Sequence, residues 1–70
     1  MQRFLVLYEK NENGYSAYVP DLPGCIATGK TKEEVEELIY GGIKFHVEGM
    51  KLEGIEIPEC TTESEVLVLQ

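Results

Sequence analysis

Residues 15–54, YSAYVPDLPGCIATGKTKEEVEELIYGGIKFHVEGMKLEG, decide the fold because they predict two short strands, a tight turn and one long helix. Residues 15–19 favour a strand that ends at Pro20, since proline cannot donate a hydrogen bond to a sheet. Leu22-Pro23-Gly24-Cys25 places Pro and Gly at the central positions of a type II turn. A short strand over residues 25–28 follows this turn and leads toward the helix.

The helix is predicted to begin after Thr31, to run to about Lys51 or Leu52, and to stop at Gly54. Thr31 and Glu34 have the spacing of a capping box, in which the hydroxyl accepts from the backbone N–H three residues later. Residues on one side recur at helical spacing and predict the face that meets the sheet: Val35, Leu38, Ile39, Gly42, His46 and Met50. Gly42 lies at the centre of this face, where a missing Cβ permits close approach, whereas Gly41 projects elsewhere.

The segments on either side of residues 15–54 complete a predicted sheet. Residues 3–10, RFLVLYEK, predict a first strand with Phe4, Val6 and Tyr8 on one face, and Leu5 and Leu7 on the other. Asn13-Gly14 supplies the turn to the next strand. After a polar connection, residues 65–69, EVLVL, predict a last strand that is apolar on both faces.

These elements predict one α+β domain over residues 1–70, with the order β-β-β-α-β. The helix returns the chain, so the last strand runs parallel to the first, giving a mixed four-stranded sheet of order 3-2-1-4 with one helix on one face. The other face stays uncovered, and a monomer would expose Leu5 and Leu7 there. We therefore expect self-association through these residues, as a homodimer or a homotetramer.

Composition narrows the classes of partner. The 70 residues carry six Lys and Arg against thirteen Asp and Glu, for a net charge of −7, which disfavours direct binding of nucleic acid and favours a basic protein partner. A chain of this length buries only about 60% of its unfolded surface, so a partner is expected on stability grounds as well. No apolar run approaches the roughly 20 residues that span a bilayer, which predicts no membrane association and a cytoplasmic location.

No set of residues predicts catalysis, a cofactor or a metal. Residues 24–31, GCIATGKT, match the phosphate-binding pattern GxxxxGK[ST], but the middle of this stretch favours a strand, which would use its N–H groups in a ladder. His46 is the only histidine, and Cys25 and Cys60 show no metal-ligand spacing. The sequence therefore predicts a protein that is not an enzyme.

One side of the helix has the composition of a contact surface. Tyr40, Ile43 and Val47 follow i, i+3, i+7 spacing outside the predicted sheet-facing side, with charged residues around them. They form either the periphery of the core or a patch for another chain, since interfaces combine an apolar centre with a charged rim. The predicted partner-binding residues are Glu36, Glu37, Tyr40, Ile43, Lys44, Val47 and Glu48.

From residue 15 to residue 50 the chain resembles the N-terminal domain of the HicB antitoxin family. The resemblance is carried by Val-Pro-Asp-Leu-Pro-Gly-Cys at residues 19–25, then Gly-Lys-Thr at residues 29–31, and then an acidic helix start. It implies a partial ribonuclease H-like fold used as a binding scaffold. It also implies contact with HicA, a small basic toxin that cleaves messenger RNA, whose active surface the antitoxin occludes.

The resemblance leaves alternatives that differ in function. Many family members continue into a helix-turn-helix or ribbon-helix-helix domain, whereas this sequence stops at Gln70, so operator binding is not expected. The chain is then an antitoxin or an orphan relative of one. Other interpretations are a degenerate hydrolase or nucleotide-binding domain on the same fold, and a purely structural oligomer.

Overall fold

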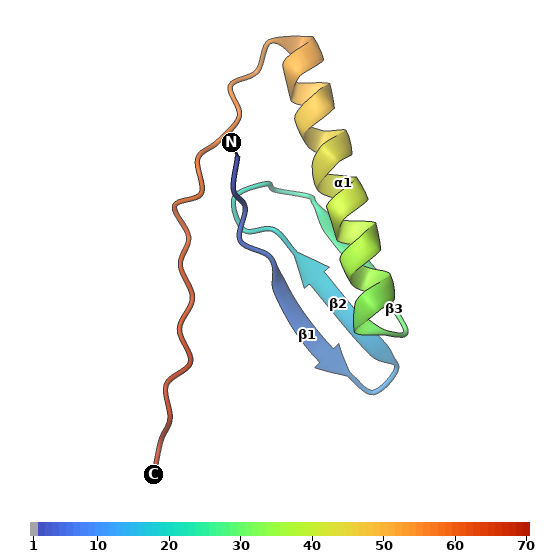
Figure 1. Cartoon of the computed structure of the whole chain (residues 1–70), viewed down its shortest axis with the longest axis vertical. Coiled ribbons are helices and arrows are strands. Elements are labelled where there is room, and N and C mark those ends of the chain that lie inside the picture. The colour runs from blue at the N-terminus through green and yellow to red at the C-terminus, as the bar shows by residue number, and fades with distance from the viewer. Residues whose placement is uncertain (1) are drawn as a thin grey trace.

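The structure, a computed structural model, describes residues 2–70 as a three-stranded sheet with one long helix (Figure 1). The elements are β1 (Leu7–Asn11), β2 (Gly14–Tyr18), β3 (Ile26–Gly29) and α1 (Lys32–Glu53). The sheet is antiparallel in the order β1-β2-β3, and α1 lies along one face. This arrangement confirms the predicted α+β class and the three-strand meander.

The predicted type II turn joins β2 to β3. The Cys25 N–H donates to the Leu22 carbonyl at 3.0 Å, and Gly24 adopts φ 85°, a value that this turn requires and that glycine adopts without steric penalty. The turn sets the register in which Tyr18 lies opposite Ile26 and Ala17 opposite Ala27. Residues 26–29, inside the phosphate-binding pattern, are therefore ladder residues of β3.

The ends of α1 are set by local chemistry that the sequence predicts. The Thr31 hydroxyl accepts from the Glu34 N–H at 3.1 Å, which satisfies one of the free N–H groups of the first turn. At the other end Gly54 adopts φ 71° and its N–H bonds back toward Lys51, which closes the helix. The described chain, residues 2–70, has no helix whose length and apolar character would let it cross a membrane.

The core lies between β2, the β2–β3 connection and the first half of α1. Its buried residues are Ala17, Val19, Leu22, Cys25, Val35 and Ile39. Gly42 faces this core, because a Cβ added to it would lie 3.6 Å from the Cys25 sulfur, whereas a Cβ on Gly41 would meet nothing within 4 Å. The predicted phase of the two glycines is therefore confirmed.

The buried side of α1 is rotated relative to the prediction. Leu38, predicted to face the sheet, is 51% exposed, while Val47, predicted to lie outside that face, is 8% exposed. Ile43 is also partly buried against the core. Phe4 and Val6, in the stretch before β1, are partly buried against the same core and line a groove together with Ile43 and Val47.

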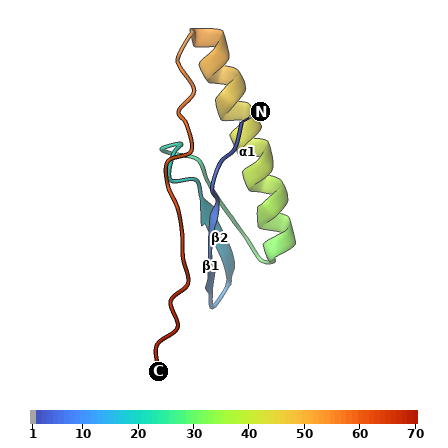
Figure 2. The same ribbon diagram turned by 60° about the vertical axis from the view of Figure 1, so that its left-hand side comes forward.

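The predicted fourth strand is not part of the sheet, which is a correction to the predicted order 3-2-1-4. Residues 55–70 contain no strand, and the apolar side chains from Val66 to Leu69 are 81–97% exposed. In Figures 1 and 2 this segment stands apart from the sheet, and Figure 2 shows α1 and the segment on opposite sides of it. We call residues 63–70 the C-terminal arm.

Candidate functional site

A groove of about 640 Å³ runs between α1 and the stretch that leads into β1. One wall comes from Phe4, Val6 and Tyr8, which alternate along an extended chain and therefore point to the same face. The other wall is the side of α1 that carries Tyr40. The complete lining is Gln2, Phe4, Val6, Tyr8, Glu36, Ile39, Tyr40, Ile43, Lys44, Val47, Glu48 and Lys51.

The structure brings six of the seven predicted partner-binding residues into this groove. The exception is Glu37, which is exposed on α1 but does not line it. The six divide by depth: Ile43 and Val47 form part of the apolar lining, while Tyr40 is 66% exposed at the rim. Charged side chains of both signs surround Tyr40, namely Glu36, Lys44 and Glu48.

Two cations lie against tyrosine rings at the groove. The Lys44 ammonium lies 5.5 Å from the centre of the Tyr40 ring, and the Lys32 ammonium lies 5.1 Å from that of Tyr8. Both distances are within the range of a cation–π contact, which orients the ring at an exposed site. Burial, together with the nearby Glu36 carboxylate, raises the pKa of the Tyr8 hydroxyl above its ordinary value.

The two residues predicted for self-association lie on the side of the sheet that α1 leaves open. Leu7 is the first residue of β1, and it lies in a row across the sheet with Tyr18 and Ile26. Leu5 and Leu7, which we expected a monomer to expose, are both half-buried, whereas Tyr18 is 43% exposed and Ile26 71% exposed. The open face is thus apolar along one row, although the structure leaves the self-association itself as a prediction.

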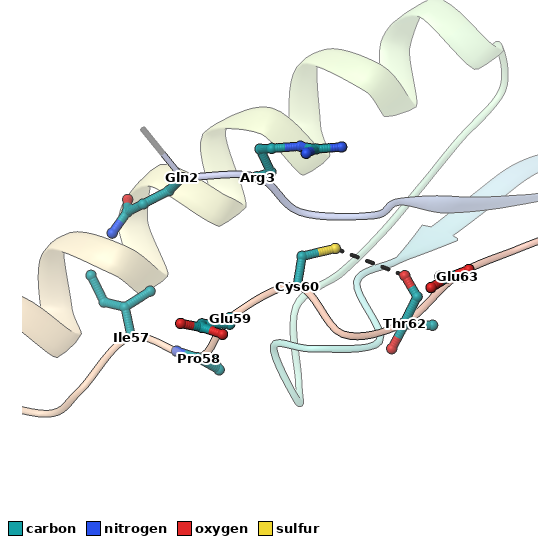
Figure 3. A pocket seen from close by; sticks show the side chains of 8 residues that line it. All are labelled: Gln2, Arg3, Ile57, Pro58, Glu59, Cys60, Thr62 and Glu63. Carbon is teal, nitrogen blue, oxygen red and sulfur yellow. Dashed lines mark hydrogen bonds between the residues drawn. The ribbon is translucent and has the colours of Figure 1, made fainter.

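A second hollow, of about 650 Å³, lies between the N-terminal stretch and the start of the C-terminal segment (Figure 3). Its lining is polar and comes from Gln2, Arg3, Ile57, Pro58, Glu59, Cys60, Thr62 and Glu63. The Cys60 thiol donates to the Thr62 carbonyl at 3.8 Å, as the dashed line in Figure 3 shows. This contact holds the chain around Cys60. The residues that line the hollow do not place a basic side chain against the Cys60 thiol, as a nucleophilic catalyst would need.

Asp21 fastens the C-terminal segment to the β2–β3 connection. Its carboxylate accepts from the Thr62 hydroxyl at 3.0 Å, the Thr61 hydroxyl at 3.3 Å and the Thr62 N–H at 3.5 Å. Partial loss of solvent acts to raise the pKa of this carboxyl, but the hydrogen bonds from Thr62 and Thr61 outweigh it and hold the pKa below its ordinary value. We call this cluster the Asp21 clasp.

The histidine and the two cysteines, which we considered as catalytic or metal-binding residues, do not lie together. His46 is half-buried on α1, Cys25 is buried and Cys60 is exposed on the C-terminal segment. Burial raises the pKa of the Cys25 thiol, so it stays protonated and unreactive. Among residues 2–70 no three His, Cys, Asp or Glu side chains gather in a way that could hold a metal ion.

Sequence analysis did not identify one exposed apolar surface on α1. Leu38, Phe45 and Leu52 are 51%, 79% and 89% exposed and recur every seven residues along α1. Gly41 and Gly49, on neighbouring positions, have open space where a Cβ would stand. The seven-residue spacing was visible in the sequence, but assigning Leu38 to the core concealed it. We call these three residues the outer stripe.

Comparison with known proteins assigns the chain. Residues 4–68 match the family described as the HicB-like antitoxin of bacterial toxin–antitoxin systems. The chain belongs to this family. The resemblance carried by residues 19–31 is therefore confirmed over nearly the whole chain.

Several similar sequences come from archaea and from a bacteriophage. A UPF0150 protein of Thermoplasma acidophilum is 37% identical over 62 residues, which cover 87% of this chain and 90% of that protein. A UPF0150 protein of Archaeoglobus fulgidus is 33% identical over 67 residues, covering 86% and 97%. A 14.9 kDa protein from the rep-hol intergenic region of Haemophilus phage HP1 is 39% identical over 54 residues, but the match covers only 41% of its length.

A solved structure has the same fold. It is a chain of the HicA3 and HicB3 toxin–antitoxin complex, with a TM-score of 0.64 and 22% identity over 84% of this chain and 72% of that one. The likeness supports the arrangement of the sheet and the helix described above.

Proposed function

We propose that this protein neutralises a small basic HicA-type toxin by protein–protein contact and that it acts without catalysis. The observation that carries the proposal is the family match over residues 4–68, joined to an exposed tyrosine with a charged rim on α1. The solved complex of HicA3 and HicB3 supports the same pairing for a chain of this fold. In this proposal the toxin binds messenger RNA and this protein does not. Both proteins act in the cytoplasm.

The proposed docking surface is the exposed part of the predicted patch, centred on Tyr40. This ring is 66% exposed and is oriented by Lys44, so it presents a large, rigid contact area at small entropic cost. Glu36, Glu37 and Glu48 add negative charge around it. An RNA-cleaving toxin needs a basic surface for phosphates, and an acidic surface of this kind both attracts and covers it.

The chain's overall charge supports rapid capture of such a toxin. A net charge of −7 over 70 residues produces a negative field that steers a basic protein toward the surface. Steering is screened by salt, because the Debye length falls to about 8 Å at physiological ionic strength. We therefore expect the association rate with the toxin to fall as salt is added, with a smaller change in the dissociation rate.

The test is co-expression with the product of the adjacent reading frame, followed by co-purification and an RNA-cleavage assay. We expect a stable complex in which cleavage is suppressed. Tyr40→Ala is expected to weaken the complex at least tenfold, the loss typical of a central aromatic anchor. Phe45→Ala is the matched control, since it removes an exposed ring from the outer stripe of the same helix.

Three results would contradict parts of this proposal. Unchanged toxin activity in the presence of excess protein would exclude neutralisation. A loss of binding with Phe45→Ala but not with Tyr40→Ala would move the docking surface to the outer stripe. Metal-dependent RNA cleavage by the purified chain alone, lost on replacing a carboxylate, would favour a degenerate hydrolase instead.

A further inference from the structure

The C-terminal arm has the composition of a β-strand but is not paired with a sheet. Residues 65–69, EVLVL, are rich in β-branched and aliphatic residues, the types that favour strands. Val66 and Val68 are 90% and 86% exposed, and Leu67 and Leu69 are 81% and 97% exposed, so both sides of the arm face water. A strand that is apolar on both sides needs cover on both sides.

The outer edge of β1 is free to pair with an additional strand. Among residues 2–70 β1 pairs only with β2, and Figure 1 shows it at the edge of the sheet. Its other edge therefore presents unpaired N–H and C=O groups. On the α1 side this edge borders the groove lined by Val6 and Tyr8. On the open side it borders the row that contains Leu7. An added strand would therefore cover the groove with one face and extend the apolar row of the open sheet face with the other.

The dimensions of the arm and the edge agree. β1 has five residues, as does the segment EVLVL at residues 65–69, of which the last four are apolar, and at about 3.3 Å per residue each spans roughly 17 Å. Side chains alternate between the faces of a strand, so Val66 and Val68 would cover one face and Leu67 and Leu69 the other. The groove rim carries two lysines and two glutamates, so its own charges balance: Lys44, Lys51, Glu36 and Glu48.

The arm is not paired with the β1 edge of its own molecule, although Figure 1 shows it on the side of that edge. The Asp21 clasp holds Thr61 and Thr62 beside the β2–β3 connection, and the arm continues from there. In both ribbon views the arm stands away from the sheet, and its end extends beyond the body of the molecule. The groove lies on the α1 side of the sheet, whereas Figure 2 shows the arm on the opposite side.

We propose that residues 65–69 of one copy add as a strand to the free β1 edge of a second copy, and that the exchange is reciprocal. Each molecule thereby gains the fourth strand that its own arm does not supply. The arm covers Val6 and Tyr8 on one face and lies beside Leu5 and Leu7, the predicted self-association residues, on the other. Tyr40 stays at the rim, so this inference stands independently of toxin binding.

Cross-linking between distinguishable copies tests the exchange directly. In a Cys60→Ser background, where the remaining Cys25 is buried, one tagged chain carries Glu9→Cys on β1 and an untagged chain carries Val68→Cys. With a short bis-maleimide we expect a tagged–untagged product. Glu33→Cys in place of Glu9→Cys is the matched control, because Glu33 is exposed in the first turn of α1 and should give none.

The mass in solution supplies the second measurement. We expect the full chain to sediment at twice 7.9 kDa, and the full-length Val66→Lys/Val68→Lys variant to sediment at 7.9 kDa with an unchanged circular dichroism spectrum. The lysines sit in an exposed segment, so the fold of each molecule is expected to persist.

Three outcomes overturn the proposal. The first is a full chain that remains at 7.9 kDa at high concentration. The second is a dimer that survives the two lysines, which would place the interface on the outer stripe or the open sheet face. The third is a cross-link that forms within a chain carrying both cysteines but never between two chains, because the arm would then close on its own β1.

Discussion

Residues 14–39 and residues 55–70 both contain aliphatic side chains, but most of these are buried in the first region and those near the end of the second are exposed. In the first region Ala17, Val19 and Val35 are at most 3% exposed, whereas Val66 and Val68 in the second are at least 86% exposed. Val19 and Val35 have the same side chain as Val66 and Val68, so the difference in burial comes from their neighbours. The packed region has a helix and two strands that follow one another closely along the chain, while the arm has no neighbouring strand in its own molecule.

The comparison teaches that apolar composition specifies burial without specifying the partner. In the packed region short connections bring consecutive elements together, and this local arrangement selects the contacts. The arm follows a polar connection that the Asp21 clasp holds away from the groove. The clasp therefore sets where the arm starts and which strand edges it can reach. The apolar run of the arm could pair equally well with a sheet in another copy.

The largest expected effect compares a buried leucine with an exposed one. Leu22 is 1% exposed, so Leu22→Ala removes packed methyl groups and leaves a cavity, which lowers the free energy of unfolding by about 2 to 5 kcal/mol. Leu67→Ala, at 81% exposure, should change the unfolding of a dilute monomer by less than about 0.5 kcal/mol. Urea denaturation followed by circular dichroism measures both values.

The concentration dependence sharpens this comparison. We expect the Leu22→Ala effect to be the same at every protein concentration, because it acts within one molecule. The Leu67→Ala effect should grow as concentration rises, because a strand shared between copies stabilises them by mass action. Equal effects of the two changes in dilute protein would show that the arm is packed in the monomer after all.

A smaller effect distinguishes the two adjacent glycines of α1. A leucine at Gly42 must extend past the Cys25 sulfur, which already lies 3.6 Å from the position of the first side-chain carbon, and should destabilise the fold by about 1 to 3 kcal/mol. Gly41→Leu points into open space and should instead gain up to about 1 kcal/mol of helix propensity. Thermal unfolding of the pair measures the difference, and identical melting temperatures would contradict the close packing.

The smallest effect concerns the clasp that joins the two regions. Asp21→Asn weakens the hydrogen bonds from Thr61 and Thr62, so we expect faster amide hydrogen exchange at Thr62 while exchange at Val35, inside the core, is unchanged. An equal acceleration at both amides would mean that the clasp stabilises the whole fold. Glu59→Gln is a matched control on the same segment, since Glu59 is exposed.

The clasp should also respond to pH in a defined direction. The pKa of Asp21 in the folded chain lies below its ordinary value of 3.8, so the carboxylate contributes stability that is fully present above pH 3.8. This contribution is lost as the pH falls through the lower, folded pKa. Protection of the Thr62 amide should therefore be constant from neutral pH down to that region and then decline, and Asp21→Asn should remove the step.

The sequence predicts those parts of the fold that depend on nearby residues. Pro23-Gly24 defines a turn, and Thr31 and Gly54 define the ends of α1, because each acts through backbone groups within a few positions. Leu38 and Val47 were assigned to the wrong sides, since helical spacing alone does not say where the neighbouring chain will cover the helix. That cover comes from Val6 and its neighbours, far away in the sequence.

The candidate site was predictable to a similar extent and for a similar reason. The spacing of Tyr40, Ile43 and Val47 identifies one side of α1, and the structure places that side along the groove. Its second wall, at Phe4 and Tyr8, and the Asp21 clasp both join residues that are distant along the chain. A fourth strand was predicted at residues 65–69 from their composition, and it is absent from the sheet because composition favours a strand without bringing it to an edge.

The unpaired edge of β1 also bears on how the protein behaves when concentrated. A molecule that offers both an edge and a projecting strand can join its copies in two ways: two copies that trade strands close a symmetric pair, whereas copies that each give to the next leave a free end and grow into a fibre. Glu63 and Glu65 precede the apolar run and would stack like charges along such a fibre, which penalises growth more than closure. Neutralising these two acids should therefore turn a clear solution of this protein turbid.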